Sequence, residues 1–210
     1  GNTIMPNDSG SNLVIDGNNC MLTPFKKANV PPPVAYRDLY VDEPITSAAI
    51  SKDNLHIVAL TNKKVYLFKQ QDKDELDWNF EQVSEFSLQG GIYTRQIAFV
   101  SNGVYILFDE MNMSNIMRLI LEGDELMMDD VIEIPTSKII TLSSNVSFDY
   151  VSYELINGTV NIIDETNSIV EVGKFPQLCT EFQIVEMTTE EEEVVLKLPI
   201  GLMPSGKMYV

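Results

Sequence analysis

The sequence predicts an all-β protein of the β-propeller class, built from degenerate, WD40-like four-stranded blades. Short runs rich in Val, Ile, Phe and Tyr alternate with turn residues, and these runs recur with a long period. The second run of each repeat begins at Leu55, Val104, Phe148 and Val194, so the spacings are 49, 44 and 46 residues. A period of roughly 40–50 residues with four strands per repeat is typical of propeller blades. A β-sandwich also contains many short strands, but it is not expected to keep so regular a period.

The first 42 residues are expected to precede the repeats. Residues 1–11 are polar and rich in Gly, Asn and Ser, which predicts a flexible lead-in. Residues 12–42 predict a β-hairpin with a tight Asp16-Gly17-Asn18-Asn19 turn and a second strand that ends at Pro24. Three consecutive prolines, Pro31–Pro33, then favour a stiff extended connection.

From residue 43 onward the sequence predicts a partial propeller, with blades at approximately 43–90, 91–136, 137–174 and 175–210. The expected strands are Ile45–Ile50, Leu55–Leu60, Val65–Phe68 and Phe80–Leu88; Gln96–Val100, Val104–Phe108, Ile116–Leu121 and Val131–Ile134; Ile139–Leu142, Phe148–Leu155, Thr159–Ile163 and Ile169–Val172; Phe182–Val185, Val194–Leu198 and Lys207–Val210. Closed rings have about four to eight blades, commonly seven in this class, whereas this chain supplies three full blades, one partial blade and the N-terminal hairpin. We therefore expect an incomplete ring whose sequence continues beyond Val210.

Two features of the repeats are irregular. Residues from Asn112 to Glu125 carry apolar side chains near helical spacing, yet Ile116–Leu121 stands where the third strand of a blade belongs, so we predict a strand. Trp78 stands in the triplet Asp77-Trp78-Asn79 and lacks the Trp-Asp ending of the best-known propeller repeats. The propeller assignment therefore depends on the period rather than on a signature.

Composition narrows the classes of function. The chain has 210 residues, 44% of them hydrophobic, and 31 acidic against 14 basic residues give a net charge of −17. Such a surface repels phosphate backbones, so no direct nucleic-acid site is expected. The charge indicates either solubility alone or an acidic face that docks a basic partner. The sequence has no run of about 18 apolar residues, so we expect no membrane span.

One segment nearly spells a phosphate-binding loop. Gly201 to Lys207 fits the spacing G-x-x-x-x-G-K, but Met208 replaces the hydroxyl residue that would hold magnesium, and no helix is predicted after it. Pro204-Ser205-Gly206 is better interpreted as a hairpin turn between two strands.

The remaining reactive residues give no catalytic pattern. His56, the only histidine, is interpreted as a solvent-side or hydrogen-bonded strand residue, because a metal site or triad would need partners. Cys20 and Cys179 are far apart and fit a reducing compartment, and nothing marks Cys179 as a nucleophile. Asp129-Asp130 and Glu190–Glu193 lack the alternating ligands and glycine of a calcium loop. We therefore assign no catalytic, cofactor-binding or metal-ligating residue.

Two features suggest contacts with partners. Five methionines, Met111, Met113, Met117, Met127 and Met128, are interpreted mainly as core or loop packing, with a partner interface as the alternative. The expected loops Gln70–Asp77 and Asn112–Ser114 are candidate contact loops, because propellers bind partners through loops at the ends of their strands. Lys26-Lys27 is too small a basic cluster for a nucleic-acid groove.

Two stretches resemble the family of largest, scaffold subunits of the Elongator complex. The first, within Ile15–Tyr40, contains D-G, then L-T-P-F-K, then P-P-P and a Tyr-containing strand. The second, within Phe175–Val210, contains F-P-Q-L-C, the acidic run before a valine strand, and then G-K-M-Y-V. The resemblance implies part of the second WD-repeat-type β-propeller of such a subunit.

The resemblance also implies a function and partners. Members of the family are non-catalytic scaffolds that assemble with a second propeller subunit and with a catalytic subunit. That catalytic subunit joins a radical S-adenosylmethionine domain to an acetyl-CoA-dependent domain, and the assembly modifies the wobble uridine of tRNA. The resemblance then implies that tRNA is a partner of the whole complex only. It implies a cytoplasmic location, with the nucleus as a second one, and no cofactor for this chain.

Two alternatives belong to other classes. A propeller enzyme such as a glycosidase or lyase would need acids or histidines on its innermost strands, and the expected first strands are almost free of acids and hold no histidine. An acidic binder of basic proteins rests on net charge alone.

Overall fold

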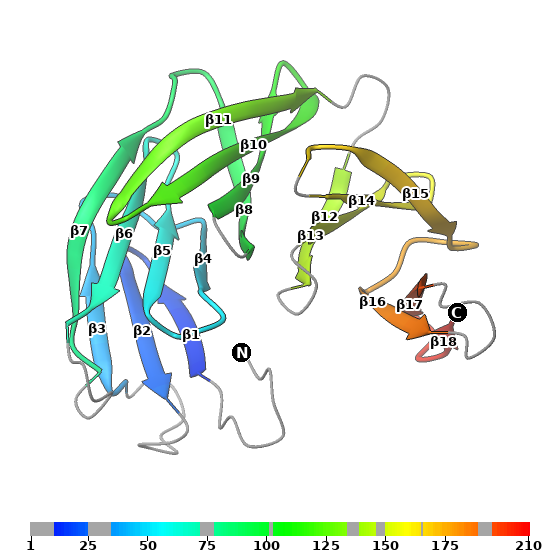
Figure 1. Ribbon diagram of the computed structural model, residues 1–210, viewed down its shortest axis with the longest axis horizontal. Helices are drawn as coiled ribbons and strands as arrows, with labels where there is room; N and C mark the ends of the chain where they lie inside the picture. Colours follow the sequence, from blue (N-terminus) through cyan, green and yellow to red (C-terminus); the bar gives the residue numbers. More distant parts are fainter. Residues whose placement is uncertain are drawn as a thin grey trace. The chain divides into compact units, whose positions relative to one another are not determined.

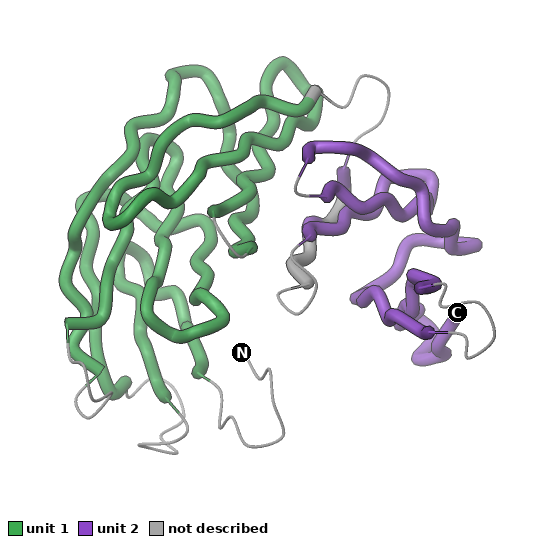
Figure 2. The backbone as a smooth tube through the Cα atoms, viewed as in Figure 1, with its two compact units in different colours: residues 1–133 green, residues 134–210 purple. Residues whose placement is uncertain are grey.

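The computed structural model describes residues 11–24, 35–71, 78–100, 103–133, 139–145, 150–164, 166–188 and 195–210. Over these ranges the chain forms strands and turns without any helix, as Figure 1 shows. Its described strands make five antiparallel sheets. The chain divides into two compact units, Gly1–Glu133 and Ile134–Val210 (Figure 2). No helix among the described residues has the length and apolar character needed to cross a membrane.

The N-terminal sheet has three strands, β1 (Ser11–Asp16), β2 (Asn19–Pro24) and β3 (Arg37–Tyr40). The predicted hairpin is confirmed, with Gly17 at φ 61° in its turn, a conformation that favours glycine. The third strand pairs with β2 and places Leu39 opposite Cys20. The predicted lead-in lies outside the described residues up to residue 10, as do the three prolines.

Two four-stranded sheets complete the first unit, and in each of them every strand pairs with the next strand in sequence. This meander is the strand order of a propeller blade. The first sheet contains β4 (Ser47–Ile50), β5 (His56–Leu60), β6 (Lys64–Gln70) and β7 (Phe80–Ser87). The second contains β8 (Tyr93–Val100), β9 (Gly103–Glu110), β10 (Met113–Glu122) and β11 (Glu125–Glu133).

The segment with mixed helical and strand signals is a strand. β10 pairs with β9 from Met113 opposite Glu110 to Ile120 opposite Gly103. Its residues from Ser114 to Leu119 are all buried, so both faces of the strand are covered. A strand buried on both faces needs no polar alternation, which explains the continuous apolar run.

Apolar side chains from facing sheets form the core of the first unit. Strand β4 contacts β8, and β7 contacts β11, so the two four-stranded sheets lie face to face with corresponding strands adjacent. Their shared core includes Val58, Val65, Leu67, Phe99, Ile106 and Leu119. The other face of the first sheet packs on the N-terminal sheet through Leu22, Leu39, Ile57, Tyr66 and Phe68.

A polar cluster around Thr94 links these two sheets at one edge. The backbone N–H of Thr94, in β8, donates to Asn62 Oδ1 at 3.0 Å. Its hydroxyl lies 3.0 Å from the carbonyl oxygen of Thr61 and 3.0 Å from the hydroxyl of Thr46. Because Thr46, Thr61 and Asn62 all belong to turns that flank the first sheet, this threonine fixes the position of β8 against that sheet.

The second unit repeats the same arrangement. One sheet contains β12 (Ile139–Asn145), β13 (Tyr150–Leu155), β14 (Thr159–Ile163) and β15 (Ile169–Lys174). The other contains β16 (Glu181–Thr188), β17 (Val195–Leu202) and β18 (Met208–Tyr209). Their core is formed by Tyr150, Val160, Ile162, Phe175, Phe182, Ile184 and Met203. The blade limits expected from the repeat stay a prediction.

Several strands are longer than the sequence predicted. β16 extends to Glu181 and Glu186 and therefore carries two acids, whereas the expected first strand carried none. β11 begins at Glu125 rather than at Val131 and includes Asp129 and Asp130. Glu181, Asp129 and Asp130 are exposed in these strands, whereas Glu186 is half-buried.

The Thr94 cluster yields a stability prediction. Thr94→Val keeps the shape and β-branching of the side chain but leaves the carbonyl of Thr61 and the hydroxyl of Thr46 without this partner. We expect a loss of about 1–3 kcal/mol in the free energy of unfolding, measured by urea denaturation. Thr188→Val, at an exposed position, is the matched control and should change stability by less than about 0.5 kcal/mol. Equal effects of the two changes would contradict the linking role.

Candidate functional site

The predicted acidic pair in β11 forms a structural contact. Asp129 Oδ2 lies 3.4 Å from Nε of Arg118, a buried arginine of the neighbouring strand β10. The guanidinium carbon of Arg118 also lies 5.7 Å from the ring centroid of Tyr105. Asp130 accepts a hydrogen bond from the backbone N–H of Val131 at 2.8 Å. Asp129 thus compensates the charge of the buried Arg118 guanidinium. The other acidic run considered in the sequence, Glu190–Glu193, lies outside the described residues.

His56 occupies the first position of β5 and is only half-buried. Burial lowers the pKa of its imidazole, and the charge of Lys69 lowers it further, against the opposing effect of Asp53. Its Nε2 is buried and has no hydrogen-bond partner among the described residues, so of the two expected alternatives, solvent-side or hydrogen-bonded, this atom does not fit the second. The nearby ammonium of Lys69 is instead paired with Asp124 at 2.6 Å. A neutral imidazole without an acid partner does not make a catalytic pair.

Both cysteines are held as neutral thiols. Cys20 is completely buried, and burial raises its pKa to about 12. Burial and then the neighbouring carboxylate of Glu154 raise the pKa of Cys179 to about 12. The thiolate is the reactive form of cysteine, so neither residue is a nucleophile near neutral pH.

The buried carboxylate beside Cys179 was missed by sequence reasoning. Glu154, in β13, is 1% exposed, and its two oxygens accept from the backbone N–H of Cys179 at 3.2 and 3.3 Å. This contact anchors the connection before β16 to the adjacent sheet. The one sequence signal for it was an acid inside the apolar run from Tyr150 to Leu155.

The near-match to a phosphate-binding loop is a β-hairpin, as predicted. Gly201 lies inside β17, where an added Cβ would overlap the Cys179 sulfur and the Phe175 ring. Gly206 has φ +80° in a turn closed by a 2.8 Å hydrogen bond from the Met203 N–H to the Lys207 carbonyl. The glycines serve packing and turn geometry, and the described residues contain no helix whose N-terminus could face this turn.

An acid–phenol pair in the first unit was also missed. The hydroxyl of Tyr66 donates to Oε2 of Glu43 at 2.6 Å, and Tyr66 is 1% exposed. Burial, followed by the hydrogen bond to Glu43, raises the pKa of this phenol. The two residues are 23 positions apart, so no local pattern could predict the pair. Across the described part of the chain, no three side chains of the metal-binding types come together.

Only part of the two candidate contact loops is both described and exposed to a partner. Gln70 lies in β6 and is buried, and residues 72–77 lie outside the described part. Ser114 is fully buried in β10 and donates to Asp109 Oδ1 at 2.9 Å, so it cannot contact a partner. Met113 and Asn112 are exposed and stay available.

The methionines are more exposed than predicted. Met117 is buried, but Met111 is 90% exposed, and Met113, Met127 and Met128 are each 48% exposed. The interpretation of the group as core or loop packing is therefore wrong for four of the five. A flexible, polarisable side chain on the surface suits adaptable interfaces, which was the alternative interpretation.

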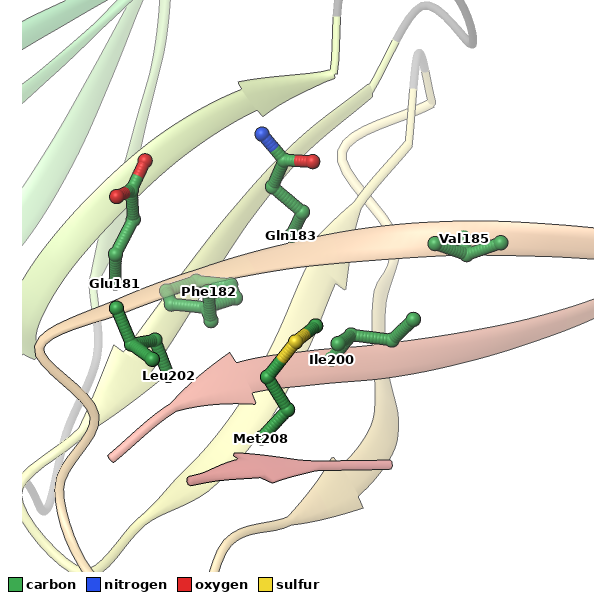
Figure 3. Close-up of a pocket in the computed structure, with 7 residues that line it drawn as sticks. All are labelled: Glu181, Phe182, Gln183, Val185, Ile200, Leu202 and Met208. Carbon is green, nitrogen blue, oxygen red and sulfur yellow. The ribbon is translucent and has the colours of Figure 1, made fainter. Parts of the chain in front are cut away.

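One groove lies on the sheet β16–β18 of the second unit. It has a volume of about 280 Å³ and is lined by side chains of all three strands. Figure 3 shows Met208 reaching from β18 toward Ile200 of β17, while the polar ends of Glu181 and Gln183 point away from them. Glu181 is the one ionisable group among these lining residues, whereas glycoside hydrolysis needs two carboxyl groups flanking the bond.

A second groove lies between the two four-stranded sheets of the first unit and has a volume of about 370 Å³. We call it the methionine groove, and its apolar lining consists of Phe86, Leu88, Ile92, Phe108, Met117, Met128 and Val131. Among the described residues that line it, Glu110 is the one charged residue. Both grooves present apolar walls and a single carboxylate, a chemistry that suits binding rather than proton transfer.

Comparison with known proteins identifies the family. A family model described as the ELP1 N-terminal second beta-propeller matches residues 14–210. The chain belongs to this family. Elongator complex protein 1 of Saccharomyces cerevisiae is 32% identical over 229 residues, covering 100% of this chain and 17% of the relative. Elongator complex protein 1 of Schizosaccharomyces pombe is 24% identical, covering 97% of this chain and 16% of the relative.

Solved structures confirm the predicted propeller fold. A putative 6-phosphogluconolactonase from Bacteroides uniformis superposes with a TM-score of 0.58 at 12% identity, covering 98% of this chain and 67% of that chain. The β-propeller domain of Cps50 (Swd1) from Myceliophteria thermophila superposes with a TM-score of 0.55 at 14% identity, covering 87% and 60%. At such low identity the likeness shows the fold alone.

The neutral cysteines yield a prediction about pH. The pKa of Cys20 rises from 9.0 to about 12 on folding. Between these values the unfolded chain releases the proton and the folded chain keeps it, so stability falls as pH rises. One such thiol contributes about 1.4 kcal/mol per pH unit. We expect the unfolding free energy of Cys20→Ala to fall less steeply with pH between pH 9 and 11, by about this amount per pH unit. Urea denaturation of both proteins under reducing conditions, at several pH values, measures the two slopes. Equal slopes in the two proteins would show that Cys20 ionises in the folded state.

Proposed function

We propose that this propeller region of an Elongator subunit is a non-catalytic scaffold that holds other subunits together. The family match over residues 14–210 carries this proposal. The arrangement of reactive groups supports it, because Cys20 and Cys179 are neutral, and Arg118, Glu154 and Glu43 are occupied by structural contacts. The chain spans 17% and 16% of the length of the two Elongator relatives, so most of such a protein lies outside it.

The proposed partners are the catalytic radical S-adenosylmethionine and acetyl-CoA-dependent subunit and the second propeller subunit. Through them the chain supports wobble-uridine modification of tRNA in the cytoplasm, with the nucleus as a second location. Its net charge of −17 agrees with a role in which tRNA contacts other parts of the assembly. The limits of the blades at about 43–90, 91–136, 137–174 and 175–210 belong to the same proposal.

A scaffold and an enzyme respond differently to two substitutions in the full-length protein. Gly201→Val disrupts packing against Phe175, so we expect subunit co-purification and tRNA modification to fall together. Glu181→Gln removes the ionisable group of the second-unit groove, and we expect it to leave both unchanged. Subunits are quantified by mass spectrometry of the purified complex, and wobble uridines by mass spectrometry of tRNA nucleosides. A fully assembled Glu181→Gln complex without modification activity would favour an enzyme.

A further inference from the structure

The methionine groove continues along one face of the second four-stranded sheet. Strand register places Met117 opposite Val131 and Leu119 opposite Met128, so Met128 and Val131 share the face on which Met117 lies. The register of β9 and β10 places Met113 directly opposite Glu110. Since opposite residues point to the same side of a sheet, Met113 extends the apolar surface past the carboxylate.

This surface is open to binding. Met113 and Met128 are 48% exposed, and Val131 is 42% exposed. The side chains behind them, Phe108 and Met117, are almost fully buried and hold the groove floor in place. The volume of about 370 Å³ falls within the range of cavities that bind ligands or inserted side chains. Methionines at the rim can adjust to the shape of what enters.

The charge of the groove indicates which kind of partner it can bind. Glu110 lines the groove, is exposed, and has no ion pair among the described residues. None of the described residues that line the groove is a lysine or arginine, and the whole chain carries a charge of −17. An apolar floor beside an open carboxylate fits an apolar side chain next to a lysine or arginine.

A second copy of the chain fits less well. In a two-fold interface the same patch meets itself, so Glu110 would approach a second Glu110 on a surface of the same negative charge. Nucleic acid is disfavoured by the same charge.

We propose that the methionine groove binds a short segment of another protein, one that carries bulky apolar side chains flanked by lysine or arginine. The proposal rests on the scaffold function, because it names a surface through which a partner of that scaffold would dock.

The chain offers matched pairs of variants for a test. Met128 and Met127 are neighbours in β11 with the same exposure, but Met127 lies opposite Ile120 and so faces the other side of the sheet. Met128→Lys therefore places a charge in the groove, and Met127→Lys places it outside. Glu110→Arg reverses the groove charge, and Glu125→Arg reverses the charge of an exposed glutamate on the outer face. Equal melting temperatures of the four variants show that each is folded.

The experiment uses full-length protein and labelled overlapping peptides that cover the other Elongator subunits. We expect binding of at least one apolar, basic peptide, weakened about tenfold or more by Met128→Lys and by Glu110→Arg. The two controls should change the dissociation constant less than about twofold. Binding should also weaken as salt concentration rises.

Three outcomes would overturn the proposal. They are the absence of any peptide binding, an equal loss with the control variants, and self-association of the chain that Met128→Lys abolishes. Co-purification of Elongator subunits with the wild-type protein is measured in the same preparations. Normal co-purification without peptide binding refutes the groove proposal alone, whereas failed co-purification refutes the scaffold function itself.

Discussion

Burial of both faces of a sheet is the constraint on which the first unit depends. Along β6, Val65 and Leu67 pack toward the sheet β8–β11, while Tyr66 and Phe68 pack toward the N-terminal sheet. Successive residues of a strand point to opposite faces, so one strand contributes to two cores. Loss of either neighbouring sheet would expose the buried side chains on one face of β6, so the first four-stranded sheet depends on both neighbours.

This constraint decides where polar groups can lie. Buried polar groups of the stacked sheets mostly have partners, as the hydroxyl of Tyr66 has in Glu43 and the carboxylate of Glu154 has in the backbone of Cys179. Groups fixed in this way have no freedom to approach a substrate. What stays available is surface at the margins of the sheets, such as the methionine groove. This packing agrees with the docking role proposed above.

Sequence reasoning predicted most strands, because alternation and turn residues are local signals. It resolved β10 as a strand only by its place in the repeat, since its burial on both faces removes alternation. It missed the first half of β11, where methionines and acids replace β-branched residues. The groove and the pair of Glu43 with Tyr66 could not be predicted, because each joins residues distant in sequence through the stacking of strands.

The register of β11 explains how its edge and the groove arise together. Met128 and Val131 are three residues apart, so in a regular strand they would point to opposite faces. A register shift between Arg118 and Leu119 of β10 leaves Asp129 as an extra residue in β11, and both side chains therefore reach the groove face. The same bulge interrupts an outer strand that carries exposed apolar side chains, which discourages pairing with another edge. One irregularity thus protects the edge while it assembles the apolar wall of the groove.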